Sequence, residues 1–128
     1  MSIFITELIV TPKTDKIWIL REPLVYYSDI LDREIRVPTT FETDLASVPR
    51  VPIAYQLWGG RAHHEAVIHD YLFRYDSKPN VRYSVANKIF REAMIVRNKP
   101  WYIRGPMYAG VVLGGWAAYH KRSVNETL

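Results

Sequence analysis

Residues 65–73, on which the fold depends most, read Glu-Ala-Val-Ile-His-Asp-Tyr-Leu-Phe. The recurrence of small and apolar residues around this stretch predicts a helix from Ala62 to about Tyr75. At its centre His69 and Asp70 are adjacent, so an imidazole and a carboxylate lie in a segment that otherwise suits a core. The elements around the helix decide whether this pair forms a reactive site or a satisfied buried cluster.

The part of the chain before this helix is rich in β-type residues. Residues 34–38 alternate between polar and apolar side chains, which is typical of a half-buried strand. Asp29–Arg33 reads as a hairpin connection, and Pro23 belongs at an edge or bulge because it cannot donate to a ladder. We expect one small antiparallel sheet formed by residues 4–10, 16–20, 24–27 and 34–38.

Two further helices are expected after it. Ser84 is a good N-cap for the second, which the turn at residues 98–100 ends. Its expected buried stripe consists of Ala86, Ile89, Phe90, Ala93 and Met94. The third is expected to start at Pro106, a favoured first-turn residue, and to run to about Arg122.

The third helix carries Gly110, Gly114 and Ala118 at intervals of four, a flat stripe that lets another backbone approach. Its apolar stretch is too short for a bilayer core of about 30 Å, so we favour a core helix, with a membrane-surface helix as the alternative. The sequence thus predicts an α+β fold, a small N-terminal antiparallel sheet followed by about three helices. We expect residues 1–128 to form a single domain, with a β-rich part (1–40), a structured loop (41–61) and a helical part (62–122).

Composition and charge limit the classes of function. The chain has 128 residues and no cysteine, which excludes disulfides and thiolate catalysis. Residues 1–73 carry a formal charge of −3 and residues 74–128 a charge of +7. The basic residues are scattered along helices without a nucleic-acid motif, so solvated helix faces are the simpler interpretation. No signal peptide is readable at the start, which predicts synthesis in the cytoplasm and leaves export by another route open.

The His69–Asp70 pair has two interpretations. Adjacent helical residues point about 100° apart, so the two cannot form a simple dyad, although His69 could act as a base while Asp70 holds a metal ion. Alternatively, Glu65–His69 and Asp70–Arg74 are ordinary i,i+4 pairs. A histidine metal cluster is disfavoured because His64 and His69 lie roughly 140° apart on a helix.

Two other segments point toward this pair. The loop at residues 43–50 reads Thr-Asp-Leu-Ala-Ser-Val-Pro-Arg. Its Asp44 could supply oxygen to a hard cation such as Ca²⁺, while Thr43, Ser47 and Arg50 bond backbone groups or close a buried pair. Asn87 on the second helix could orient the imidazole of His69 by a hydrogen bond.

These motifs resemble a bacteriophage and prophage family of unknown function. The resemblance rests on Phe41 with residues 43–50, on His-Asp-Tyr-Leu-Phe at residues 69–73, and on Ala-Asn at residues 86–87 with Phe90 and Ala93-Met94. In that family the second motif usually ends in Tyr and the third usually reads Ala-Asp, so this chain departs at Phe73 and Asn87. The resemblance implies a phage-encoded protein with phage protein partners or a second copy of itself, in the host cytoplasm or the virion.

The layout is also distantly similar to the phospholipase A2 site. That likeness implies His69 as the general base, Asp70 and Asp44 as calcium ligands, and Asn87 in place of an orienting aspartate. Phe73 and Asn87 depart from that site too, and its glycine-rich calcium loop and cysteines are missing.

The sequence therefore leaves two classes of function. One is a metal-assisted hydrolase of cell-envelope lipid or peptidoglycan, and the other is a non-catalytic phage structural or assembly protein. A reactive site requires a solvent-accessible His69 with Asp44, Asp70 and Asn87 within bonding range. A fully buried His69 with both nitrogens satisfied would exclude the hydrolase.

Overall fold

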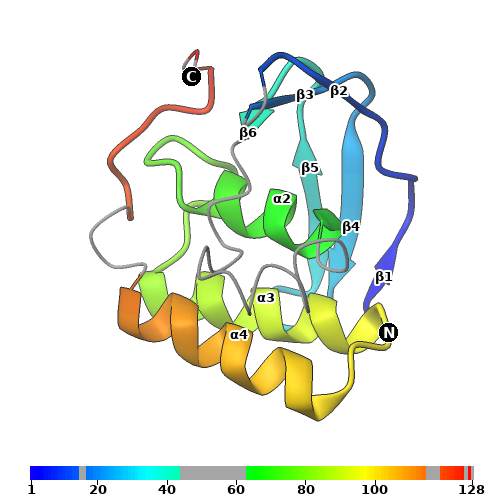
Figure 1. Ribbon diagram of the computed structural model, residues 1–128, viewed down its shortest axis with the longest axis vertical. Coiled ribbons are helices and arrows are strands. Elements are labelled where there is room, and N and C mark those ends of the chain that lie inside the picture. Colours follow the sequence, from blue (N-terminus) through cyan, green and yellow to red (C-terminus); the bar gives the residue numbers. More distant parts are fainter. Residues whose placement is uncertain (15–16, 44–62, 115–118, 126, 128) are drawn as a thin grey trace.

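The computed structural model describes residues 1–14, 17–43, 63–114, 119–125 and 127. Its fold is α+β, as the sequence predicted. Two small antiparallel sheets come from the N-terminal part, and helix α2 (His63–Leu72) lies between them and the pair α3 (Tyr83–Val96) and α4 (Trp101–Gly114) (Figure 1). The candidate residues His69 and Asp70 are thus on the helix between the two layers.

The first sheet has the order β1-β4-β5 and contains the predicted hairpin. Strand β4 (Leu24–Ser28) pairs along its whole length with β5 (Arg33–Val37), and β1 (Ile3–Phe4) joins the other edge of β4. The predicted alternation on β5 is confirmed, because Ile35 and Val37 are buried while Glu34 and Arg36 are exposed. This buried face packs toward α2.

The prediction of one sheet was wrong, because a second sheet has the order β2-β3-β6. It consists of Val10–Pro12, Trp18–Leu20 and Glu42–Thr43, the last in the segment expected to be loop. The expected strand at residues 4–10 is divided at Thr6, whose hydroxyl donates to Pro23 O (3.0 Å) and accepts from Val25 N (3.0 Å). The side chain replaces ladder bonds of the backbone there, so the chain bends away and pairs elsewhere.

Helix α2 is buried on nearly every side. From Glu65 to Leu72, Asp70 alone is partly exposed. A helix with so little solvent-facing surface belongs inside a domain, and its apolar residues join the main core with both sheets. It ends at Leu72, three residues before the predicted end.

Helix α3 buries the predicted stripe of five residues, together with Asn87. Its start differs from the prediction. Arg82 is the extended residue before the helix, and its carbonyl accepts from Ala86 N (2.9 Å). Ser84 therefore lies inside the first turn, past the capping position. The expectation of Ser84 as N-cap was therefore wrong by two residues.

Helix α4 begins five residues earlier than predicted. The Pro100 carbonyl accepts from both Ile103 N and Arg104 N (3.0 Å each), so the helix is established before Pro106, which lies within it. The predicted end at Arg122 is also wrong, because Tyr119 and His120 form a turn with a left-handed φ of 57° at His120. Residues 115–118 lie outside the described part.

A second core cluster joins the helices. Ile103, Met107 and Val111 of α4 pack on Phe90 and Met94 of α3 and on Ala66 of α2. Among the described residues, no helix has the length and apolar character needed to cross a membrane.

Candidate functional site

The imidazole of His69 faces helix α3. Its Nε2 lies 2.7 Å from Oδ1 of Asn87, and the side chain is only 2% exposed. Because an amide oxygen only accepts, Nε2 carries the hydrogen and donates it. Asn87 therefore orients the ring and fixes its tautomer, the geometry that the sequence predicted for this pair.

Aromatic rings enclose the same imidazole. The ring centroids of Phe73 and Phe90 lie 4.1 and 4.8 Å from that of His69. Burial lowers the pKa of His69 to about 4, against the opposing effect of the hydrogen bond to Asn87. His69 is therefore neutral near pH 7 and sits in an apolar setting.

Asp70 faces the opposite neighbour, strand β6. Its Oδ2 accepts from the Thr43 hydroxyl (2.5 Å) and lies 3.3 Å from Nη2 of Arg74. That nitrogen also donates to Glu42 O (3.3 Å), and the guanidinium lies over the Phe41 ring at 5.1 Å. The predicted Asp70–Arg74 pair is confirmed, and it connects α2 to β6.

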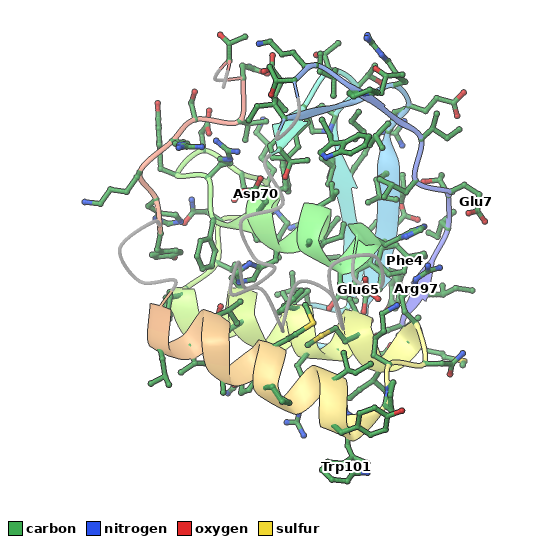
Figure 2. All side chains as sticks on the ribbon, in the orientation of Figure 1. Phe4, Glu7, Glu65, Asp70, Arg97 and Trp101 are labelled. Carbon is green, nitrogen blue, oxygen red and sulfur yellow. The ribbon has the colours of Figure 1, made fainter. Side chains whose placement is uncertain are left out.

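Glu65 does not form the predicted pair with His69. Its side chain is fully buried, and within the described residues neither carboxylate oxygen has a hydrogen-bond partner. Figure 2 shows it beside Arg97, whose Nε lies 3.7 Å from Oε1. Burial raises the pKa of Glu65 to about 7, while Lys99 and Arg97 oppose that shift.

The candidate residues thus fall into separate groups. His69 with Asn87 joins α2 to α3, and Asp70 with Thr43 joins α2 to β6, as the 100° offset of neighbouring helical residues requires. Phe73 packs on the imidazole as well as on Tyr83 and Tyr119. Asp44, Ser47 and Arg50 lie outside the described residues, so their predicted roles stay predictions.

The model of one protein family matches residues 18–111, which extend from β3 into α4. The family is described as a protein of unknown function, DUF1353. The chain belongs to the DUF1353 family. No curated protein and no solved structure matches it. Family membership therefore brings no assigned activity to the His69 and Asp70 groups.

Calcium is a poor fit to the described residues of this DUF1353 member. Of the two predicted ligands only Asp70 is described, and its Oδ2 already faces a guanidinium and a hydroxyl. Ca²⁺ takes six to eight oxygens. Among the described residues there is no group of three or more His, Asp or Glu side chains suited to a metal ion. A site that also uses Asp44 stays a prediction.

Sequence reasoning missed one polar link of this DUF1353 member. The Glu92 carboxylate on α3 accepts from the Tyr26 hydroxyl (2.7 Å) and from Ile30 N (3.0 Å), which ties the β4–β5 hairpin to α3. Burial and this carboxylate raise the pKa of Tyr26. The signal was weak, because Glu92 directly precedes the buried stripe residue Ala93 but resembles any exposed helical acid in the sequence.

Proposed function

We propose that this protein is a non-catalytic, bacteriophage-encoded structural or assembly protein, and that its polar cluster stabilises the fold. The observation that carries the proposal is the enclosure of His69, which is 2% exposed and lies against Phe73 and Phe90. A catalytic base has to reach the proton that it abstracts. A buried imidazole that contacts two phenyl rings and is bonded to Asn87 is better suited to joining two helices.

The surroundings of Asp70 support the same role. Its carboxylate is matched by the buried cation of Arg74 and by the Thr43 hydroxyl. The polar contacts of His69 and of Asp70 thus each join α2 to another element of the fold. The phage origin, a place in the host cytoplasm or virion, and phage protein partners or a second copy as partner rest on the motif resemblance.

A metal-assisted hydrolase of envelope lipid or peptidoglycan is the second candidate. The observation that favours it is the tautomer of His69, because donation from Nε2 to Asn87 makes Nδ1 the unprotonated ring nitrogen, the type of atom that acts as a general base. The low pKa, about 4, keeps the ring neutral but also makes it a weak base.

The two candidates differ in one assay. Phospholipid-ester and peptidoglycan hydrolysis is measured with Ca²⁺ and with chelator, for the wild type, for His69→Gln and for an exposed control, Thr39→Gln. The proposal expects background rates in all three proteins under both conditions. A calcium-dependent rate that disappears in folded His69→Gln but persists in Thr39→Gln would overturn it and establish the hydrolase.

A further inference from the structure

Helix α4 contacts the rest of the molecule along one side, and its opposite side is exposed. We call this exposed side the α4 outer face. Trp101 is 73% exposed and Leu113 is 78% exposed, and Figure 2 shows Trp101 projecting away from the body of the molecule. The α4 outer face consists of Trp101, Tyr102, Gly105, Pro106, Ala109, Val112 and Leu113.

The α4 outer face contains no charged residue. Arg104, the one charged residue of the helix, lies at its flank, where Nη1 donates to Lys99 O (2.9 Å). Contiguous exposed apolar surface of this kind marks an interaction site. Helix α4 is therefore apolar on its outer face as well as on the side that packs against α2 and α3.

Positive charge lies along one flank of this face, the Tyr108 side. There Lys88 and Arg91 line a groove of about 670 Å³, and the Arg91 guanidinium lies 5.7 Å from the Tyr108 ring centroid. Two carboxylates line the same groove, but Asp29 pairs with the N-terminal amine and Glu92 accepts from Tyr26 and Ile30 N. Neither cation has an ion pair within the described part of the chain. Arg104, one helical turn from Tyr108, adds a third cation on the same flank. A partner that is apolar opposite this face and anionic opposite its Tyr108 flank would complement the surface.

We propose that the α4 outer face docks on the surface of an anionic phospholipid bilayer. Apolar side chains such as Leu113 enter the acyl boundary, Trp101 and Tyr102 take the headgroup level that such rings prefer, and the flanking cations meet lipid phosphates. A second copy of the chain fits less well, because the carboxylates of this flank, Asp29 and Glu92, already have partners within the chain, so paired faces would bring their cations together.

Binding is measured by co-sedimentation with vesicles of phosphatidylglycerol and phosphatidylcholine, and with vesicles of phosphatidylcholine alone. The wild type should partition onto the anionic vesicles, less so in high salt. Gly105→Glu puts a charge in the middle of the α4 outer face, and a Cβ at this position meets nothing within 4 Å. This variant should lower the partition at least about tenfold, because the charge repels phosphates and resists burial.

Thr39→Glu is the matched control, since it makes the same change of charge at an exposed position after β5. It should lower binding far less than Gly105→Glu. Circular dichroism checks the fold, and Leu113→Asn replaces Gly105→Glu if that variant unfolds. Equal losses in the variant and control, no binding of the wild type to anionic vesicles, or a wild-type dimer that Gly105→Glu dissociates would overturn the proposal. Because no turnover is measured, the outcome is independent of the proposed function.

Discussion

At the residue scale, burial acts in opposite directions on two side chains of α2. His69 is held neutral with a pKa of about 4, and Glu65 is held protonated up to about pH 7. Both residues avoid carrying a charge in the interior, as desolvation requires. Their contributions to the pH dependence of stability therefore have opposite signs and partly cancel between about pH 4.5 and 6.5.

His69→Gln isolates the first contribution. In the unfolded chain a histidine takes up its proton near pH 6.5, whereas folded His69 does so only near pH 4. The unfolded state thus binds more protons between these values, and the folded state loses up to about 3 kcal/mol as pH falls through them. Urea unfolding from about pH 7 to about pH 4 should show this loss in the wild type relative to His69→Gln. Parallel curves would contradict it.

Glu65→Gln isolates the second contribution. The unfolded carboxyl ionises near pH 4.5 and folded Glu65 near pH 7, so the folded state binds more protons between them and loses stability as pH rises. The amide has no such loss. The free energy of unfolding of the variant should therefore gain about 3 kcal/mol on that of the wild type between pH 4.5 and 7. Glu34→Gln, at an exposed position on β5, is the control and should show no comparable gain.

At the element scale, the link between α2 and β6 depends on the ion pair between the partly exposed Asp70 and the buried Arg74. Asp70→Asn leaves the buried guanidinium of Arg74 without its counter-charge, and we expect a cost of about 3 kcal/mol. Thr43→Val removes one hydrogen bond to the same carboxylate and should cost about 1 kcal/mol. Chemical denaturation of both variants measures the difference. An equal or reversed order would mean that the ion pair contributes little.

Pro106 lies inside α4 and, having no backbone N–H, leaves out one of the hydrogen bonds of the helix. Pro106→Ala restores the missing donor at an exposed position, so thermal unfolding should show a gain of about 2 kcal/mol. Gly105→Ala, at the neighbouring exposed position, improves helix propensity without restoring a bond and should gain about 1 kcal/mol. A smaller gain for Pro106→Ala than for Gly105→Ala would mean that the helix has adapted to the proline.

The elements also show what sequence patterns can predict. Periodicity placed β5 and the buried stripe of α3 correctly, because both depend on neighbouring residues in the chain. The division of the first strand at Thr6 depends on its bonds to Pro23 and Val25, nearly twenty residues away. Likewise, the spacing predicted the Asp70–Arg74 pair. That Glu65 instead lies 3.7 Å from Arg97 depends on where α3 ends.

At the scale of the whole molecule, α2 is the element that the other parts share. Its residues reach β6 through Asp70, α3 through His69 and the end of α3 through Glu65. The polar contacts of His69 and Asp70 therefore connect α2 to the layers on either side of it. The exposed outer layer, α4, is where we expect the molecule to meet another surface.

The central position of α2 has a consequence for the life of the protein in a cell. With almost no side facing solvent, this segment can be reached by a protease or exchange its amide hydrogens only when the covering layers separate. Cleavage there should follow the rare opening of the entire domain, whereas α4 can fray alone. A protease would therefore cut outer segments such as α4 first, and the His69–Asp70 segment of α2 among the last.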